Sequence, residues 1–174
     1  MQNIKTLFED IHIIKSPVFE DNRGRFTKLF NTTPPLHSFQ IQQINCVDNH
    51  QKDILRGLHY QKGPWAESKF FRILSGSIRL AIADLRKESI HYTKSLMIDI
   101  QSTDVGVLIP KGCATGYLVT QPNTTVLYYS DNAYKPESEG GIRWDDPTFS
   151  FNWQTNNKPI LSEKDMTWNN FNIT

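Results

Sequence analysis

One seven-residue segment, Leu55–Gln61 (LRGLHYQ), places an arginine, a histidine, a tyrosine and a glutamine among apolar residues. Polar groups buried in a strand that only fills a core are costly unless they are hydrogen-bonded. The segment therefore suits a site where a histidine takes a proton from an anionic, oxygen-rich ligand. A single histidine in a strand is also common as a satisfied core or surface residue, so the segment alone leaves both interpretations open.

A lysine and an aspartate are the next candidates for chemistry. Residues 69–86 are predicted to form a hairpin around a two-residue Ser75-Gly76 turn. In that register Lys69 lies opposite Ile82, and Lys69 and Asp84 become diagonal neighbours about 7–8 Å apart at the backbone. Their face is the more apolar one and should be interior; it also carries Phe71, Ile73, Ile78, Leu80 and Ile82. The pair is either a rim salt bridge or a charged pocket wall, and we favour the wall because a buried pair stabilises little.

Short strands are the elements that must position these groups. Turn residues recur between runs rich in Ile, Val, Leu, Phe and Tyr, a spacing typical of an all-β sandwich, jelly roll or small barrel. Only residues 5–10 and 162–167 favour short helices. Because there is no internal repeat, low-complexity tract or linker, residues 1–174 are expected to form a single domain.

Composition limits the classes of partner. The 174 residues include 19 basic and 18 acidic side chains, and a net charge of +1 gives no bulk attraction to nucleic acid or membranes. The two cysteines, Cys46 and Cys113, lie far apart and fit a reducing cytoplasm. No apolar run approaches the roughly 18 residues that span a bilayer, and the N-terminus lacks a signal profile. We expect a soluble cytoplasmic protein.

Segments spread over about residues 8–168 form an ordered set: Asp21–Phe26, Gln43-x-Asn45, Leu55–Gln61, Lys69, Asp84, Ile109–Gly112, Tyr134–Pro136, Gly141–Pro147 and Leu161–Asp165. In order and approximate spacing this set resembles the dTDP-4-dehydrorhamnose 3,5-epimerase family. The resemblance implies a cupin-like jelly roll, a homodimer, and no metal or organic cofactor. It also implies a nucleotide-linked 4-keto-6-deoxy sugar as substrate, inverted at C3, C5 or both during deoxysugar synthesis for cell-surface polysaccharide.

Epimerisation beside a ketone removes a C–H proton and returns it to the other face. A base alone cannot remove so weakly acidic a proton quickly, so the enolate oxygen must meet fixed positive charge. By the resemblance, His59 is the general base and Asp165 its carboxylate partner. Lys69 would stabilise the enolate, and Tyr134 would protonate the opposite face. Asp84, beside Lys69, would keep that ammonium charged and oriented.

The resemblance also implies a set of residues lining the nucleotide and pyrophosphate end: Arg23, Phe26, Gln43, Asn45 and Arg56. Two positions depart from the family pattern. Thr115 stands where members usually have a histidine, and Lys28 where a glutamate usually follows the Arg-Gly-x-Phe motif. Both lie where ligand recognition is expected. They bear on which sugar and nucleotide bind, and on how many carbons are inverted.

Several alternatives remain open from the residues. Asp165 could be an N-terminal helix residue near Ser162, Tyr134 a core tyrosine at a loop, and Arg23 part of a turn. A metal-dependent cupin would need clustered ligands, commonly two histidines one residue apart, and the five histidines show no such spacing. Two further rivals are a non-catalytic nucleotide-sugar-binding module and a single-site epimerase, at C3 or C5, of a GDP- or CDP-linked sugar.

Overall fold

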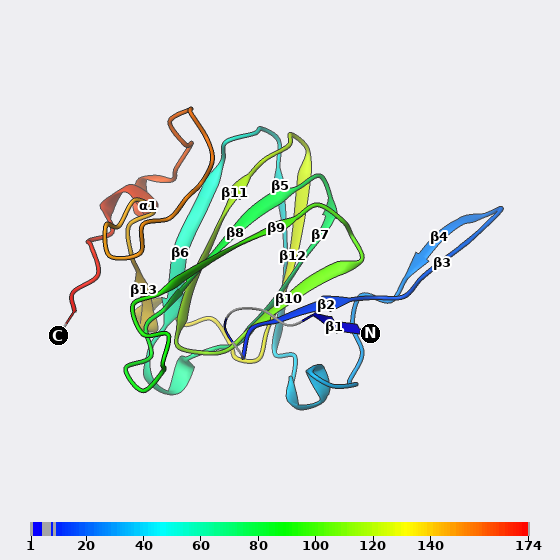
Figure 1. Ribbon diagram of the computed structural model, residues 1–174, viewed down its shortest axis with the longest axis horizontal. Helices are drawn as coiled ribbons and strands as arrows, with labels where there is room; N and C mark the ends of the chain where they lie inside the picture. Colours follow the sequence, from blue (N-terminus) through cyan, green and yellow to red (C-terminus); the bar gives the residue numbers. More distant parts are fainter. Residues whose placement is uncertain (1, 5–7, 9, 174) are drawn as a thin grey trace.

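The computed structural model describes residues 2–4, 8 and 10–173, and two antiparallel sheets make up its body (Figure 1). The larger sheet, in the order β1-β2-β10-β7-β12-β5, contains β1 (Gln2–Ile4), β2 (His12–Lys15), β5 (Gln43–Asn49), β7 (Lys69–Ser75), β10 (Val105–Ile109) and β12 (Thr124–Ser130). The smaller sheet, in the order β13-β6-β11-β8-β9, contains β6 (Leu55–Gln61), β8 (Ile78–Asp84), β9 (Ser95–Ile100), β11 (Cys113–Val119) and β13 (Glu139–Gly141). The predicted all-β jelly-roll architecture is confirmed.

Helical structure is short. Three 3₁₀ turns, η1 (Leu36–Ser38), η2 (Gly63–Trp65) and η3 (Pro136–Ser138), lie in loops, and α1 (Glu163–Thr167) is the C-terminal helix that the sequence predicts. The predicted N-terminal helix over 5–10 falls largely outside the described residues; residues 8 and 10 lie in a bend and a turn. Within the described part of the chain, no helix has the length and apolar character needed to cross a membrane.

The main core fills the space between the two sheets. Phe71, Ile73 and Val126 come from the larger sheet, and Leu80 and Ile82 come from the smaller one. All five are at most 4% exposed. Alternation along each strand places these side chains inward, so the strands pack by opposing apolar faces. The interior face predicted for residues 71–82 is therefore correct.

The predicted pairing of that segment is wrong. Strand β7 pairs with β10 and β12, whereas β8 pairs with β9 and β11 in the other sheet. The Ser75-Gly76 turn carries the chain from one sheet to the other. Gly76 has a φ of +72°, and a Cβ there would lie 2.0 Å from Oγ1 of Thr124. Both strands are central in their own sheets, so the two apolar faces meet across the core and not edge to edge.

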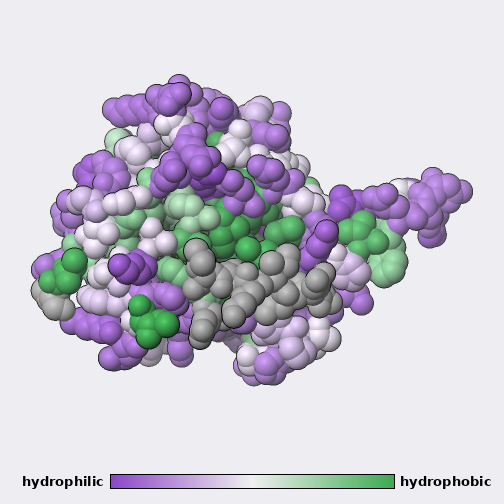
Figure 2. Space-filling view, in the orientation of Figure 1, coloured by the Kyte–Doolittle hydropathy of each residue, from purple (hydrophilic) through white to green (hydrophobic). Residues whose placement is uncertain are grey.

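A separate two-stranded arm projects away from this body (Figure 1). It consists of β3 (Val18–Asp21) and β4 (Gly24–Thr27). Phe19 and Phe26 are 59% and 62% exposed on it. Figure 2 shows apolar surface on the arm between a polar tip and a polar base. Large aromatic side chains left in solvent on a projecting hairpin are unusual for an isolated chain.

Candidate active site

Two adjoining cavities open between the sheets and share His59, Lys69 and Tyr128. The larger has a volume of about 240 Å³ and is also lined by Val47, Arg56, Phe71, Thr115, Gly116, Tyr117, Ser162, Lys164 and Asp165. The smaller, of about 80 Å³, is also lined by Gln43, Asn45, Tyr60, Gln61, Glu67, Ser130, Tyr134 and Glu139. Most of the residues singled out from the sequence therefore converge on one place.

An irregularity in β6 brings Arg56 and His59 to the same cavity. Three residues apart in a regular strand, they would point to opposite faces. The register with β11 shifts, because Thr115 pairs with His59 and Tyr117 pairs with Arg56. The extra β6 residue lies near Gly57, where a Cβ would stand 2.5 Å from the Cα of Gly116. Such a bulge re-aims side chains beside a site.

His59 is paired with Asp165. Its Nε2 lies 2.6 Å from Oδ1 of Asp165, while Oδ2 accepts a hydrogen bond from the backbone N–H of Gly57. Asp165 is 4% exposed. Burial alone would raise the pKa of this carboxyl, but the hydrogen bond from His59 and the attraction between the two groups outweigh it and lower the pKa. An ionised Asp165 fixes Nε2 as the protonated nitrogen and leaves the lone pair on Nδ1.

Helix α1 explains how Asp165 is held. Ser162 is the N-cap residue, and its Oγ accepts a hydrogen bond from the backbone N–H of Asp165. Asp165 is thus both a first-turn helix residue and the partner of His59. After the helix, the ring of Trp168 packs edge-on against His59 with ring centroids 6.1 Å apart. A Cβ on Gly141, which pairs with His59, would lie 2.2 Å from that indole.

Lys69 is paired with Glu67 and not with Asp84. Its Nζ lies 3.2 Å from Oε1 of Glu67, and its side chain is 13% exposed. Asp84 instead accepts hydrogen bonds from Arg86 and from the Ser89 hydroxyl. The predicted Lys69–Asp84 pair is wrong because it rested on a hairpin that does not form. Asp84 lines neither cavity and fixes the turn after β8.

Tyr134 belongs to a hydrogen-bonded chain at the cavity mouth. Its hydroxyl donates to Oε2 of Glu139 at 2.5 Å, and the same oxygen accepts from Nζ of Lys164 at 2.5 Å. The bond to Glu139 raises the pKa of the tyrosine. Burial alone would raise the pKa of Glu139, but its bonds from Lys164 and Tyr134 outweigh it and lower the pKa. The phenol therefore stays protonated near neutral pH.

The loop that carries Tyr134 is anchored by two glutamines. The Gln61 side chain donates to the carbonyl of Ala133 and accepts from the backbone N–H of Lys135. Gln43 accepts from the backbone N–H of Tyr134 and donates to Asn45. Gln61 thus ties the loop to the same strand that carries His59. Gln43 and Asn45 line the tyrosine side of the site, and Arg56 and Thr115 the larger cavity.

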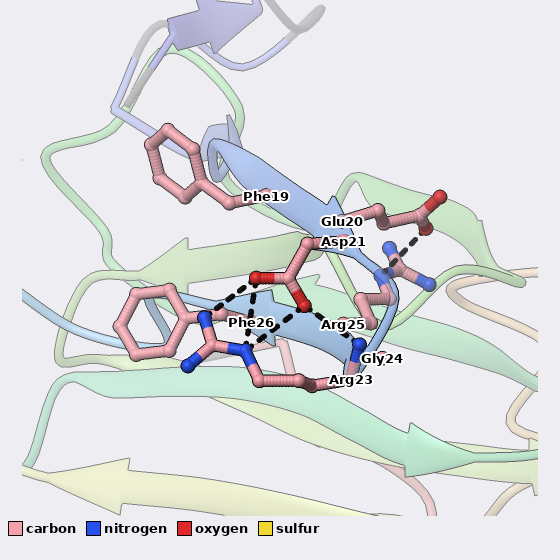
Figure 3. Close-up of a pocket in the computed structure, with 7 residues that line it drawn as sticks. All are labelled: Phe19, Glu20, Asp21, Arg23, Gly24, Arg25 and Phe26. Atoms are coloured by element: carbon pink, nitrogen blue, oxygen red, sulfur yellow. Dashed lines mark hydrogen bonds and ion pairs between the residues drawn. The ribbon is translucent and has the colours of Figure 1, made fainter.

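Arg23 and Phe26 are not brought to this site within the chain. Both lie on the projecting arm, where Figure 3 shows Arg23 folded back onto Asp21. The arm residues line a hollow of their own, formed by Phe19–Asp21 and Arg23–Phe26. Lys28 follows β4 and is exposed. Within one chain, Arg23 and Phe26 therefore lie apart from Gln43 and Asn45, and their role at the nucleotide end of the site stays a prediction.

Sequence reasoning missed several cavity residues. Glu67, Glu139 and Lys164 each form an ion pair or hydrogen bond with a candidate catalytic residue or its partner. No periodic pattern marks them, because all three lie at strand ends, in loops or in the helix. Gln61 could have been identified from the sequence, because a glutamine among apolar strand residues indicates a specific polar role. Over the described residues, no three or more His, Cys, Asp or Glu side chains gather as a metal-binding group.

Several known proteins are similar to this chain in both sequence and fold. A family model described as dTDP-4-dehydrorhamnose 3,5-epimerase matches residues 5–172. The enzyme of that name from Escherichia coli K12 is 35% identical over 169 residues, covering 95% of this chain and 91% of that protein. A Bacillus anthracis structure with TDP and PPi bound has a TM-score of 0.92 at 30% identity, covering 98% of this chain and 99% of its own. A Legionella pneumophila epimerase in complex with dTDP-4-keto-L-rhamnose has a TM-score of 0.91 at 28% identity, covering 97% and 92%.

Proposed function

Because this chain belongs to the dTDP-4-dehydrorhamnose 3,5-epimerase family, we propose that it epimerises a dTDP-linked 4-keto-6-deoxy sugar at C3, C5 or both. The observation that carries this proposal is the His59–Asp165 pair, 2.6 Å apart, in a cavity that also contains Lys69. A base with a fixed tautomer and a cation in one enclosed space are what proton removal beside a ketone requires.

His59 acts as the base through Nδ1. Asp165 holds Nε2–H and stabilises the imidazolium that forms when the C–H proton arrives. Lys69 meets the C4 oxygen, where negative charge develops as the enolate forms. Its side chain is mostly buried beside Glu67, which keeps it oriented toward the cavity shared by both groups.

Tyr134 returns a proton to the opposite face of the enolate. It belongs to the smaller cavity, whereas Asp165 belongs to the larger one, and His59 and Lys69 lie in both. A sugar ring held at the shared residues would therefore have the tyrosine on one side. Because Glu139 raises the pKa of the phenol, Tyr134 is protonated before the step and is available as an acid.

The arm supports a homodimer. Phe19, Arg23 and Phe26 are exposed on the arm. The arm itself projects away from the body of its own chain (Figure 1). We propose that each arm lies over the site of a second copy, where Arg23 contacts phosphate and Phe26 packs on the base of the nucleotide. The free thiols of Cys46 and Cys113 fit a cytoplasmic location.

The dimer has its own test. An Arg23→Ala chain mixed with a His59→Asn chain should regain activity, because one site of the mixed dimer then receives a native arm and a native base. Mixtures that stay as inactive as the separate variants, or a chain that sediments as a monomer at micromolar concentration, would refute the arm exchange.

Incubation in deuterated water tests the activity. With dTDP-4-keto-6-deoxyglucose and no added metal or dinucleotide, nuclear magnetic resonance should show deuterium entering at C3, C5 or both. Parallel incubations with the GDP- and CDP-linked sugars report on the nucleotide. Binding of dTDP without any exchange would indicate a non-catalytic module, and activity that a chelator abolishes and zinc or iron restores would indicate a metal-dependent enzyme.

A further inference from the structure

Gly141 leaves a space beside His59 that a cross-strand neighbour would otherwise fill. Strand β13 pairs with β6, and Gly141 lies directly opposite His59. Opposed residues of an antiparallel pair place their side chains on the same face, with Cβ atoms about 4.5–5.5 Å apart. Glycine has no side chain to place there. The space next to the imidazole is therefore open to a side chain from outside the strand pair.

The indole of Trp168 occupies that space. A Cβ added to Gly141 would lie 2.2, 2.3 and 2.6 Å from Cε2, Cδ2 and Nε1 of Trp168. The same ring packs edge-on against His59, with ring centroids 6.1 Å apart. Any side chain at position 141 would have to displace the indole. Gly141 and Trp168 thus act together, because the tryptophan replaces the missing neighbour of His59.

The tryptophan is fixed at both of its neighbouring elements. It is the C-cap residue of α1, the helix that carries Asp165. The carbonyl of the next residue, Asn169, accepts a hydrogen bond from the backbone N–H of Arg143, shortly after β13. Nζ of Lys164 lies over the indole, 5.7 Å from the ring centroid. The segment after α1 is therefore tied to the helix and to the chain that follows β13, which holds the indole in position.

The His59–Asp165 hydrogen bond is incompletely shielded from water. The Asp165 side chain is 5% exposed, whereas that of His59 is 31% exposed. Water that reaches the imidazole competes for its proton and weakens the attraction between the two groups. Trp168 contacts His59 but lines neither cavity. The indole therefore covers part of the imidazole away from the space that the sugar would occupy.

We infer that Trp168 is a positioning residue for the base: its indole, packed on Gly141, holds the His59 imidazole against Asp165 and limits the access of water to their hydrogen bond. The inference rests on the proposed function, which makes His59 the base. It accounts for a large aromatic side chain in a space that exists only because residue 141 has no side chain. Trp168 should therefore affect the rate of proton removal and leave nucleotide binding unaltered.

The exchange rates of two substitutions at position 168 test this role. Trp168→Ala should incorporate deuterium about 10- to 100-fold more slowly than the wild type, because the imidazole is no longer held in place. Its affinity for dTDP, measured by calorimetry, should be unchanged. Trp168→Phe keeps an aromatic ring beside His59 and should recover most of the rate. Trp144→Ala is the matched control and should exchange like the wild type, because this partly buried tryptophan packs on a core cluster and lines neither cavity.

Gly141→Ala perturbs the same contact from β13. The added methyl group must displace the indole, so this variant should also slow exchange by about 10-fold or more. In the Trp168→Ala background the three nearest obstacles to that methyl group are gone. Adding Gly141→Ala there should lower the rate by less than about 2-fold further, since the two substitutions remove one shared contact. Losses that multiply in the double variant would overturn the inference.

Nuclear magnetic resonance of the His59 side chain separates positioning from a general loss of structure. In isotope-labelled wild type, the uncharged imidazole should show the Nε2–H tautomer that Asp165 selects. Trp168→Ala should show a mixture of tautomers, or an Nε2 proton that exchanges rapidly with water, while its circular dichroism matches the wild type. An unchanged His59 signal in this variant, or an exchange rate within about 2-fold of the wild type, would overturn the inference.

Two outcomes have their own reading. If Trp168→Ala does not fold, the His59 signal of Gly141→Ala decides, and an unchanged tautomer there would overturn the inference. Failure of the proposed function looks different, because the wild type would show a fixed tautomer that depends on Trp168 yet exchange no proton of the keto sugar.

Discussion

Replacing Asp165 by asparagine isolates the contribution of one carboxylate charge to the base. The substitution keeps the size of the side chain and the backbone hydrogen bond from residue 165 to Ser162, so α1 should still form. It removes the negative charge 2.6 Å from Nε2 of His59. An amide that donates to Nε2 would also move the imidazole proton to Nδ1, the nitrogen proposed to accept the substrate proton.

The expected magnitude follows from that distance. At an effective dielectric constant of about 20, unit charges 2.6 Å apart attract by about 6 kcal/mol. The amide dipole and water recover part of this attraction, since the His59 side chain is 31% exposed. A net loss of about 4–5 kcal/mol in stabilising the imidazolium corresponds to about 10³–10⁴-fold in the rate of proton removal.

The assay is initial deuterium incorporation into the keto sugar, with circular dichroism as the check on folding. Glu163→Gln is the matched control, because it removes a carboxylate two residues away on α1, from an exposed residue outside the cavities. The control should retain wild-type exchange. If Asp165→Asn folds and keeps more than about a tenth of the wild-type exchange rate, Asp165 does not support the base electrostatically.

Three further predictions concern other positions. Tyr134→Phe should still incorporate deuterium with retention of configuration but make little inverted product, as measured by nuclear magnetic resonance of the recovered sugar. Inversion at the normal rate would mean that another residue is the acid. Thr115→His should change the ratio of C3 to C5 labelling or the sugar preference with little effect on the first exchange, and an unchanged ratio would make Thr115 a packing residue. Asp84→Asn should destabilise the fold by about 3 kcal/mol near neutral pH, because a buried partner of Arg86 is lost. Burial opposes the ionisation of Asp84, but its bonds from Arg86 and Ser89 prevail and lower its folded pKa. Its contribution is therefore complete above the unfolded pKa and is lost as pH falls through the folded one. Urea unfolding should show the difference between the variant and the wild type shrinking as the pH falls below the ordinary aspartate pKa of about 3.9; a difference that stays constant there would contradict this.

The sequence predicts the interior faces of β7 and β8 but not their partners. Period-two alternation identifies Phe71, Ile73 and Leu80 as inward-facing whichever strand lies beside them. A two-residue turn, by contrast, serves both a hairpin and a crossing between sheets. The choice depends on how the other strands compete for each edge, and no local pattern records that. The Lys69–Asp84 error follows from this one ambiguity.

For the site, the sequence predicts which side chains come together better than it predicts their orientation. The resemblance brought His59 and Asp165 together although 106 positions separate them, and the structure places them in contact. Strict alternation would have put Arg56 and His59 on opposite faces, because the bulge at Gly57 depends on the close approach of Gly116. The projection of the arm also lies beyond local patterns, since a hairpin signal says nothing about where the hairpin points.

The role of His59 as the base is tested most directly by the deuterium exchange rate of His59→Asn beside that of the wild type. Asparagine keeps a polar side chain of similar reach but cannot serve as the base. We expect a folded variant that binds dTDP normally and exchanges hydrogen at C3 and C5 about 10²–10⁴-fold more slowly than the wild type. His50→Asn, an exposed site outside the cavities, should exchange like the wild type. Exchange by His59→Asn above about a tenth of the wild-type rate would show that another residue removes the proton.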